Sequence, residues 1–323
     1  MVKVIRVHRP GGPEVLQLED IELAPPGPGE VQLRHHAIGV NYIDIYRRTG
    51  AYPAELPFVP GHEGAGEVIA VGEGVEHFEP GDRVAYVGAL GGYSEARNIA
   101  AASLVHLPKS ISYAVGATMM LKGLTAQYLL RRTFRVKKGH RVLVHAGAGG
   151  VGHLLCQWAS ALGAKVIATV GSEEKAHIAR QAGAKDVILY REEDFAQRVR
   201  EITKGKLCHV VYDGVGAATF PASLDCLAPF GLFVSYGSAS GPVAAFDLGL
   251  LAQKGSLFAT RPSLFTHIAD RKTYDEMIED VERAVKRGRL TFDVASSFPL
   301  EHAAKVHRAL EARQTAGSIV LTP

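Results

Sequence analysis

The arrangement of hydrophobic and polar positions changes twice along the chain. Up to about residue 120, short runs of alternating hydrophobic and polar residues are separated by Gly and Pro, as in VKVIRV at 2–7, VQLRHHAIGV at 31–40 and DRVAYV at 82–87. Alternation with a period of two is typical of half-buried strands, and Gly and Pro mark the turns between them. This part of the chain therefore predicts a small, coiled β-domain, with one short helical turn at 41–48.

From about residue 123 the pattern becomes strand, helix, strand, helix. HRVLVHA at 140–146 precedes a helical segment at 150–164, and KVIATV at 165–170 precedes a second one at 172–184. The strand segments are hydrophobic without strict alternation, as expected when helices cover both faces of a parallel sheet. Crossover helices with short links complete βαβ units. The middle of the chain therefore predicts a doubly wound α/β domain.

After about residue 262 come two helical segments and a final strand, SIVLT at 318–322. This tail is too short to fold alone, so we expect it to pack on the N-terminal part of the chain. The expected fold is α/β, with a β-rich domain formed by 1–122 and 262–323 and a doubly wound parallel-sheet domain, 123–261, inserted into it. The length of 323 residues agrees with about two domains.

Composition and charge exclude several classes of protein. The chain is 47% hydrophobic and 21% charged, so it can bury substantial cores and is not disordered. No hydrophobic run approaches the roughly 18 residues that cross a bilayer, and the N-terminus lacks the hydrophobic stretch of a signal peptide. Three widely spaced cysteines, Cys156, Cys208 and Cys226, indicate buried thiols in the reducing cytoplasm instead of a disulfide framework. A net charge of +3 without a long basic run argues against a nucleic-acid groove.

The strongest motif is AGAGGVG at 146–152. Gly147, Gly149 and Gly152 satisfy the spacing G-x-G-x-x-G, which by itself is weak evidence in a chain with 35 glycines. Here the motif follows a predicted strand and opens a predicted helix, which is the context in which it binds a dinucleotide. The glycines permit a tight turn, close approach of the backbone to a pyrophosphate and close contact between helix and sheet. The phosphates then face N–H groups at a helix N-terminus.

The next strand indicates which dinucleotide is bound. Enzymes that use NAD place Asp or Glu about 20 residues after the first glycines, where it accepts a hydrogen bond from the ribose 2′-hydroxyl. Here KVIATV ends without a carboxylate, Gly171 and Ser172 leave room for a 2′-phosphate, and Lys175 can pair with it. Glu173 and Glu174 add opposing charge, although acidic residues are also favoured in the first turn of any helix. The pattern favours NADP over NAD.

A second motif, VPGHEGAGEV at 59–68, resembles the G-H-E-x-x-G-x-V segment of the medium-chain dehydrogenases, whose N-terminal domain is GroES-like. In the zinc alcohol dehydrogenases of that superfamily, this histidine and two cysteines hold the catalytic metal. His62 and Glu63 are present, but 39–42 and 118–126, where the cysteines would stand, contain none. The loop of the structural zinc is absent as well. A tetrahedral catalytic zinc needs three protein ligands, so we expect no metal.

The chain as a whole resembles the bacterial NADPH:quinone reductases related to ζ-crystallin, a zinc-free branch of that superfamily. The resemblance covers essentially all 323 residues and includes NYIDIYRRTGAY, FVPGHEGAGEV, CQWASALGAKVIATVGS, YREEDF and KGSLFATRPSL. It implies a GroES-like catalytic domain, a Rossmann domain that binds NADPH, and reduction of a quinone. Residue by residue it implies cofactor contacts from Asn41, Tyr128, Gly150, Val151, Gly171 to Lys175, Tyr190, Tyr236, Gly237, Ser238 and Arg313.

Without a metal, catalysis must rely on orientation and on hydrogen bonds. A quinone accepts electrons readily, so it needs to be held over the nicotinamide and to have donors that meet the charge developing on its oxygens. Tyr46 and Tyr52 are the expected donors, with Asn41 near nicotinamide and substrate. Arg261 is expected to add a fixed positive charge. An ordinary packing role stays open for each tyrosine and for Arg261, and the resemblance allows transfer of a hydride or of single electrons.

Two other functions stay open. A metal-free reductase of the activated double bond of an enal or enone needs the same NADPH and the same donors, so only substrate preference separates it from a quinone reductase. Recognition of RNA, as some ζ-crystallin relatives suggest, is a function of a different class, against which the modest charge argues. We also expect a homodimer, because a strand near 256–260 would leave a hydrophobic sheet edge exposed.

Overall fold

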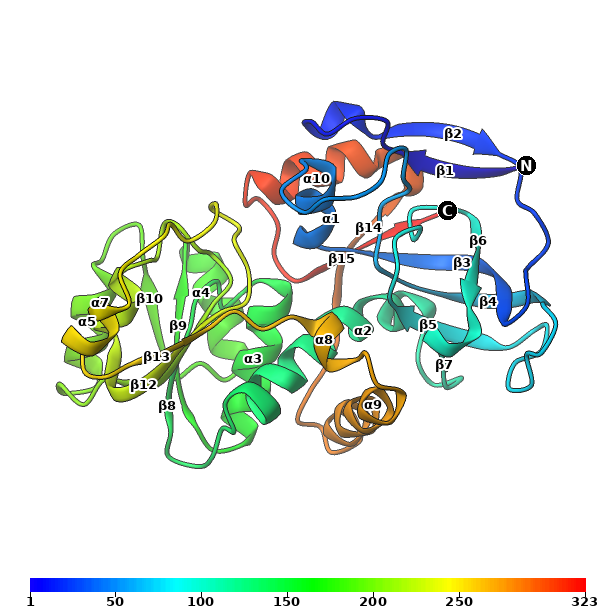
Figure 1. Cartoon of the computed structure of the whole chain (residues 1–323). Coiled ribbons are helices and arrows are strands. Elements are labelled where there is room, and N and C mark those ends of the chain that lie inside the picture. Colours follow the sequence, from blue (N-terminus) through cyan, green and yellow to red (C-terminus); the bar gives the residue numbers. More distant parts are fainter. The chain divides into compact units, whose positions relative to one another are not determined.

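The structure, a computed structural model, describes residues 1–323. They divide into two compact units, one formed by Met1–Leu121 with Phe292–Pro323 and the other by Lys122–Thr291. In the colours of Figure 1 the first unit runs from blue to cyan and takes up the chain again in red at the C-terminus.

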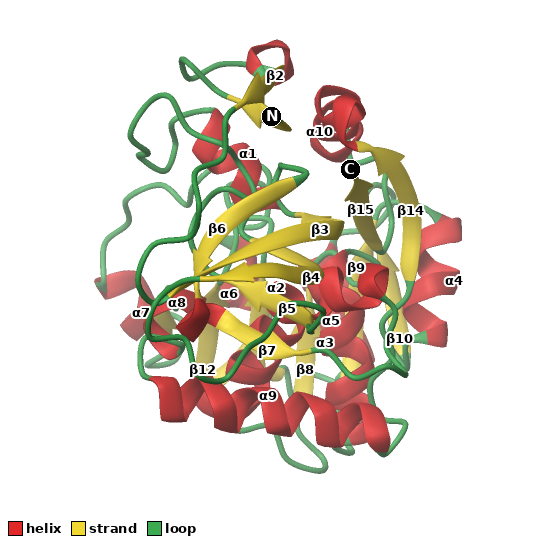
Figure 2. Ribbon diagram, turned by 90° about the vertical axis from the view of Figure 1, so that its right-hand side faces the viewer, coloured by secondary structure: helices red, strands yellow, loops and turns green.

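The first unit is rich in strands. Its seven-stranded sheet has the order β14-β15-β3-β4-β5-β7, with β6 paired to β3, and a separate hairpin joins β1 and β2. In Figure 2 the strands β6, β3, β4, β5 and β7 are seen side by side. The strands of this unit are β1 (Val2–Arg6), β2 (Gln17–Ile21), β3 (Glu30–Val40), β4 (Glu63–Val71), β5 (Arg83–Val87), β6 (Ala96–Ala100), β7 (Leu104–His106), β14 (Val294–Pro299) and β15 (Ser318–Thr322).

The C-terminal strand completes this sheet. β15 pairs antiparallel with β3, with Ile319 opposite Val40, so the final strand of the tail packs on the N-terminal part, as expected. Helices α1 and α10 and three short helical turns accompany the strands, while α2 continues past the boundary of the unit. Their bounds are α1 (Tyr42–Arg48), α2 (Tyr113–Tyr128), α10 (Ala303–Glu311), η1 (Pro13–Val15), η2 (Ala101–Ser103) and η4 (Leu300–His302).

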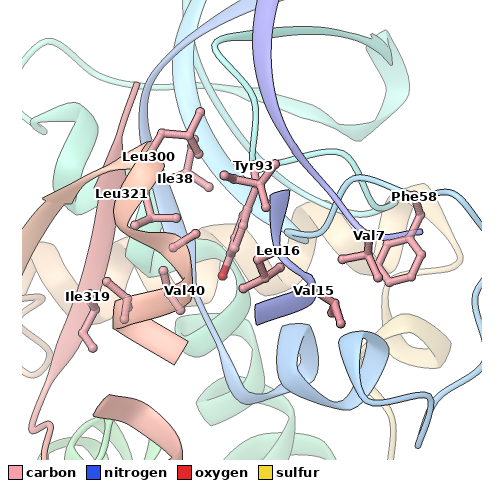
Figure 3. Packing of buried hydrophobic residues seen from close by; sticks show 13 residues of the cluster. Val7, Val15, Leu16, Ile38, Val40, Phe58, Tyr93, Leu300, Ile319 and Leu321 are labelled. Atoms are coloured by element: carbon pink, nitrogen blue, oxygen red, sulfur yellow. The ribbon is translucent and has the colours of Figure 1, made fainter. Parts of the chain in front are cut away.

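A hydrophobic cluster joins the hairpin, the sheet and the C-terminal helix of the first unit. In Figure 3 the ring of Tyr93 lies among side chains that come from distant parts of the chain, including Ile38 of β3, Leu300 of η4 and Leu321 of β15. Every second residue of the first half of β3 is buried, as the alternating pattern predicts. The core therefore holds β3 and its continuation into α1 in place. Of the predicted site residues, Asn41 precedes α1, Tyr46 lies on it and Tyr52 follows it.

The second unit contains a six-stranded parallel sheet with the order β10-β9-β8-β11-β12-β13. The order reverses between β8 and β11, as in a doubly wound dinucleotide-binding domain, and ligands bind at the carboxyl ends of the strands near such a point. Its elements are η3 (Leu129–Thr133), β8 (Arg141–Val144), α3 (Gly150–Ala161), β9 (Lys165–Val170), α4 (Glu173–Gln181), β10 (Asp186–Leu189), α5 (Phe195–Ile202), β11 (Cys208–Asp213), α6 (Ala222–Asp225), β12 (Leu227–Ser235), α7 (Gly249–Gln253), β13 (Phe258–Thr260), α8 (Leu264–His267) and α9 (Arg271–Lys286).

Residues 262–291 lie in the second unit, whereas their sequence pattern had assigned them to the β-rich domain. Helix α9 is attached by polar contacts, since Asp280 accepts hydrogen bonds from Gln127 (3.2 Å) and from Arg131 (3.4 Å). Beyond the helix, the backbone N–H of Thr291 donates to the side chain of Gln157 on α3 at 2.8 Å. Contacts between residues so distant in sequence leave no local pattern. No helix in the structure is long and hydrophobic enough to cross a membrane.

Candidate functional site

The Gly-rich turn between β8 and α3 depends on two close contacts. A Cβ added to Gly147 would lie 2.7 Å from the Cβ of Ala168 on β9, and one added to Gly152 would lie 2.2 Å from the carbonyl oxygen of Ala146. Both distances are too short for any side chain. The motif therefore brings the turn close to β9 and the start of α3 close to the backbone of the turn, which is the structural role that its glycines have in dinucleotide sites.

The start of α3 offers backbone N–H groups to an anion. Gly149 has an extended backbone (φ −78°, ψ 167°) as the N-cap of α3, and no side chain caps the helix there. The first N–H groups of a helix have no partner within the helix, and the helix dipole favours negative charge beside them. Gly150 and Val151, in the first turn, are only half-buried. These features are the ones that favour binding of a pyrophosphate at a helix N-terminus.

The end of β9 gathers four of the predicted cofactor residues. Gly171 follows the strand, and a Cβ placed on it would lie 2.8 Å from the hydroxyl of Tyr190. Ser172 caps α4, since its hydroxyl accepts the backbone N–H of Lys175 at 3.4 Å. The same space also borders Arg191, whose Nε would lie 3.5 Å from a Cβ on Gly171 and which the sequence pattern did not single out.

A buried carboxylate organises the loop that follows β11. Oδ1 of Asp213 accepts the backbone N–H groups of Val215 (2.7 Å) and Gly216 (3.0 Å). Oδ2 accepts the hydroxyls of Thr219 (2.6 Å) and Ser223 (3.2 Å). Asp213 is fully buried, so these four donors replace the water that an ionised carboxylate would otherwise need. Sequence reasoning missed this residue because its role depends on partners brought together by the fold.

The loop after β11 in turn holds the predicted residues 236–238. The carbonyl of Asp213 accepts the N–H of Tyr236 at 2.8 Å, and a Cβ on Gly237 would lie 2.6 Å from the carbonyl oxygen of Gly214. Arg261, which follows β13, donates from Nη1 to the carbonyl of Ser235 at 2.8 Å. The structure therefore brings residues 236–238 and Arg261 together at the carboxyl end of β12.

A neutral histidine links the ends of β8 and β9 to helix α6 of the second unit. The ring of His145, which follows β8, lies 2.9 Å from the hydroxyl of Thr169 on β9 and 3.0 Å from the hydroxyl of Ser223. Burial lowers the pKa of His145, although the charge of Asp213 opposes the shift. Since Ser223 donates to Asp213, Nε2–H of the histidine donates to Ser223 and Nδ1 accepts from Thr169.

Tyr128 lies at the C-terminal end of α2. Its ring stacks on His267 with centroids 4.6 Å apart, and it is almost completely buried. The carbonyl of the next residue, Leu129, accepts the hydroxyl of Tyr212 on β11 at 2.9 Å. These contacts attach Tyr128 to the second unit.

In the first unit, Asn41 is held by a buried glutamate. Asn41 is 7% exposed, and its Nδ2 donates to Oε1 of Glu63 at 2.8 Å. The other oxygen of Glu63 accepts the backbone N–H of Leu121 at 2.8 Å. A Cβ on Gly39 would lie 2.4 Å from Glu63 and 2.2 Å from the carbonyl oxygen of Ala117, so only glycine fits there. Glu63 therefore orients the Asn41 amide, a role that the motif alone does not reveal.

A chain of buried polar groups fixes the backbone of Asn41. Its N–H donates to Oδ2 of Asp44 at 2.9 Å, and the hydroxyl of Tyr93 donates to the same oxygen at 3.1 Å. Nε2 of His307 lies 2.9 Å from the Tyr93 hydroxyl, and its Nδ1 lies 3.2 Å from Arg48. Burial, with a further contribution from the charge of Arg48, lowers the pKa of His307 to about 3. The neutral ring donates to Tyr93 and accepts from Arg48.

The two predicted catalytic tyrosines lie side by side on α1 and the loop after it. The ring centroids of Tyr46 and Tyr52 are 5.2 Å apart, and both side chains are half-buried. Tyr42 at the start of α1 donates from its hydroxyl to the carbonyl of Leu310 at 2.8 Å. That bond ties α1 to the end of α10, after which Arg313 has a left-handed backbone (φ 57°). Within the first unit, Asn41, the tyrosines and the segment of Arg313 are thus linked.

The side chains around His62 do not fit a zinc ion. Nδ1 of His62 lies 2.7 Å from the carbonyl oxygen of Gly88, and burial lowers the pKa of His62 to about 4. Its neighbour Glu63 is used by Asn41 and by the backbone. No group of three or more His, Cys, Asp and Glu side chains in the structure could hold a metal ion.

Comparison with known proteins agrees with this geometry. A family described as "Alcohol dehydrogenase GroES-like domain" matches residues 27–130, and one described as "Zinc-binding dehydrogenase" matches residues 150–283. Together they define an oxidoreductase of the medium-chain dehydrogenase/reductase superfamily, with a GroES-like and a Rossmann domain, which confirms the predicted fold class.

Full-length relatives identify the branch of this superfamily. The chain is 51% identical to a quinone oxidoreductase of Pseudomonas aeruginosa, with 100% of both chains covered. It is 46% identical to a 2-haloacrylate reductase of a Burkholderia species, with 100% of this chain and 99% of that one covered. The crystal structure of Escherichia coli quinone oxidoreductase complexed with NADPH superposes with a TM-score of 0.97 at 48% identity, covering 99% of this chain and 100% of that one. The chain belongs to the quinone oxidoreductase family, as its sequence resemblance implied.

Proposed function

We propose that this enzyme reduces quinones with NADPH and without a bound metal. The observation that carries the proposal is the end of β9, where Gly171, Ser172 and Lys175 stand in place of a carboxylate. A ribose 2′-phosphate fits that position, whereas an NAD site would have Asp or Glu there. Relatives that are about half identical over their whole length and are named quinone oxidoreductases support the substrate class.

Different residues of the second unit contact different parts of the cofactor. The pyrophosphate accepts hydrogen bonds from the N–H groups at the start of α3, beside the close contacts made at Gly147 and Gly152. The 2′-phosphate pairs with Lys175 and accepts a hydrogen bond from the hydroxyl of Tyr190. The backbone of 236–238 and the ring of Tyr128 contact the nicotinamide end. Asn41 and Arg313 of the first unit are further cofactor contacts that the family resemblance implies.

NADPH, when bound, supplies the electrons as a hydride, and the side chains of this enzyme orient the acceptor and stabilise the charge that forms on it. Asn41 has two amide hydrogens, of which Glu63 accepts one, so the second is presented in a fixed direction. The hydroxyls of Tyr46 and Tyr52 donate to the quinone oxygens, and their rings give a flat surface for a planar substrate. Arg261 adds a positive charge near the developing negative charge.

An acceptor comparison tests this function. At saturating NADPH, the purified enzyme is given 1,4-benzoquinone, 2-chloroacrylate or an α,β-unsaturated ketone, each with and without a chelator. The proposal expects the highest kcat/KM with the quinone and no effect of the chelator. Loss of activity with the chelator would show that a metal takes part and would contradict the proposed mechanism.

A second candidate function is reduction of an activated carbon–carbon double bond. The observation in its favour is the 46% identity, over the full length, to a protein named 2-haloacrylate reductase. Such a substrate needs the same cofactor and the same oxygen-stabilising donors. Turnover of 2-chloroacrylate or of the ketone with little or none of the quinone would favour this function over the first.

The enzyme forms a homodimer through β13 in this proposal. β13 is the last strand of the six-stranded sheet, with only β12 as a neighbour. Phe258 on β13 is 60% exposed, and Phe230 and Leu248 are 72% and 74% exposed. A second copy pairing edge to edge across a two-fold axis would satisfy the strand and cover these side chains. A monomer at micromolar concentration in light scattering would contradict the proposal.

We place the enzyme in the cytoplasm. The support is its three free, buried cysteines, which are typical of proteins from a reducing compartment. Fractionation of cells that produce the protein tests this assignment, and recovery in the extracellular or periplasmic fraction would contradict it.

A further inference from the structure

We propose that Arg191 is a further residue that selects NADPH over NADH, acting on the 2′-phosphate together with Lys175 and Tyr190. The inference rests on the proposed use of NADPH. It adds a third polar group to the recognition of the phosphate, one that stands outside the strand–turn–helix segment in which a sequence pattern would search for it.

The sheet places Arg191 beside the end of β9. Strands β9 and β10 are parallel neighbours with Leu189 opposite Val170. The pairing continues one residue further, since the N–H of Tyr190 donates to the carbonyl of Val170 at 3.2 Å. The residues that follow the two strands therefore lie next to one another, and Arg191 stands beside Gly171.

The side chain of Arg191 points into the space that Gly171 leaves open. Its Nε would lie 3.5 Å from a Cβ on Gly171, and the hydroxyl of Tyr190 would lie 2.8 Å from the same point. Two hydrogen-bond donors that directly follow β10 thus face the place where β9 ends. Lys175 lies in the first turn of α4, the helix that follows β9 and Gly171.

The neighbouring carboxylates do not neutralise Arg191. Glu193 pairs with Arg198 at 2.7 Å and also accepts the N–H of Leu189 at 2.9 Å. Glu173, which sequence reasoning counted against a phosphate site, pairs with Arg180 at 3.4 Å. Arg191 itself forms no ion pair in the structure.

An exposed arginine without a partner is by itself an ordinary solvated residue. The role proposed for Arg191 therefore depends on its position beside Gly171. A phosphate dianion has three oxygens that accept hydrogen bonds, and a guanidinium can engage two of them at once, whereas an ammonium acts as a point charge. A ribose 2′-hydroxyl carries no charge and gains little from a cation. Arg191 is therefore expected to strengthen binding of the phosphorylated cofactor without affecting the other.

The test compares Arg191→Gln with Arg200→Gln. Arg200 is an exposed arginine on α5 without an ion pair, so the control removes the same charge from the same unit. Isothermal titration measures binding of NADPH and NADH, and of 2′,5′-ADP and 5′-AMP, which carry or lack the same phosphate. We expect Arg191→Gln to weaken binding of NADPH and 2′,5′-ADP by about ten- to a hundredfold, the range of a charge-assisted hydrogen bond. Binding of NADH and 5′-AMP should stay within about twofold, as should all four ligands with Arg200→Gln.

The outcomes distinguish failure of the role of Arg191 from failure of the proposed use of NADPH. If the unmodified enzyme binds NADPH no better than NADH, the proposed use of NADPH fails and this inference fails with it. If the unmodified enzyme prefers NADPH and Arg191→Gln keeps that preference, only the role of Arg191 is refuted. Equal weakening of NADPH and NADH would also refute it, because a general loss of structure does not depend on the 2′-phosphate. Partial recovery of NADPH binding in Arg191→Lys would support a charge acting at this position.

Discussion

Replacing Gly152 by alanine tests the close contact on which the Gly-rich turn depends. The added Cβ would lie 2.2 Å from the carbonyl oxygen of Ala146, whereas carbon and oxygen atoms ordinarily approach to about 3.3 Å. The start of α3 must therefore move by about an ångström. The obstacle is backbone and cannot rotate away, so the cost should be near the upper end of the range for overpacking, about 2–3 kcal/mol.

Part of this cost is offset, because alanine is a better helix former than glycine by about 1 kcal/mol. We therefore expect Gly152→Ala to lower the free energy of unfolding by about 1–2 kcal/mol, which for a protein of 323 residues lowers Tm by about 2–3 °C. Movement of the helix start also displaces the N–H groups that would face the pyrophosphate. Loss of one hydrogen bond to a charged group should weaken NADPH binding by about tenfold or more.

Thermal unfolding and titration with NADPH measure the two effects, with Gly88→Ala as the control. A Cβ on Gly88 would have no neighbour closer than 3.7 Å, so the control adds the same atom without a clash. If Gly152→Ala had the Tm and the NADPH affinity of the unmodified enzyme, the argument from the close contact would be refuted.

Three further predictions concern the buried polar groups and the sheet edge. Asp213→Ala leaves two backbone N–H groups and two hydroxyls without their acceptor. Denaturant titration should therefore show a free energy of unfolding lower by at least about 2 kcal/mol, and the KM for NADPH should rise. Unchanged values would contradict the role of this carboxylate. Burial lowers the pKa of His35 and of His307 from 6.5 to about 3, so the unfolded chain binds more protons and stability should fall as the pH decreases from 6.5 towards 3. His35→Asn should show a shallower fall of Tm over that range, and an equal slope would count against the assignment. Phe258→Asp should convert the proposed dimer to a monomer in light scattering without loss of secondary structure, whereas a dimer of unchanged stability would exclude β13 as the interface.

The sequence predicted the elements whose pattern is local. The strands and glycines of the second unit follow from hydrophobic runs and from one motif, and the structure has α3 beginning within that motif at Gly150. Helix α2 (Tyr113–Tyr128) was not predicted, because its residues are hydrophobic on almost all sides and nearly all of those after its first turn are buried. A helix that is buried all round has no amphipathic period to detect.

The contacts that shape the candidate site depend on tertiary structure. Asn41 and Glu63 lie on different elements, 22 residues apart, and only the folded sheet brings them to 2.8 Å. The partners of Asp213 lie in a loop and a short helix whose sequence carries no distinctive pattern. Arg191 follows a strand that is adjacent to β9 in the sheet but not in the chain. Family resemblance could name many cofactor contacts, but it could not reveal which residues hold them in place.

Formation of the hydroquinone is the direct evidence that this enzyme transfers electrons from NADPH to a quinone. Enzyme, 1,4-benzoquinone and either NADPH or NADH are mixed without oxygen, and the hydroquinone formed is measured against the cofactor consumed and against a reaction without enzyme. We expect enzyme-dependent formation of one hydroquinone per NADPH, with a kcat/KM for NADPH well above that for NADH. Absence of enzyme-dependent hydroquinone, or a preference for NADH, would contradict it.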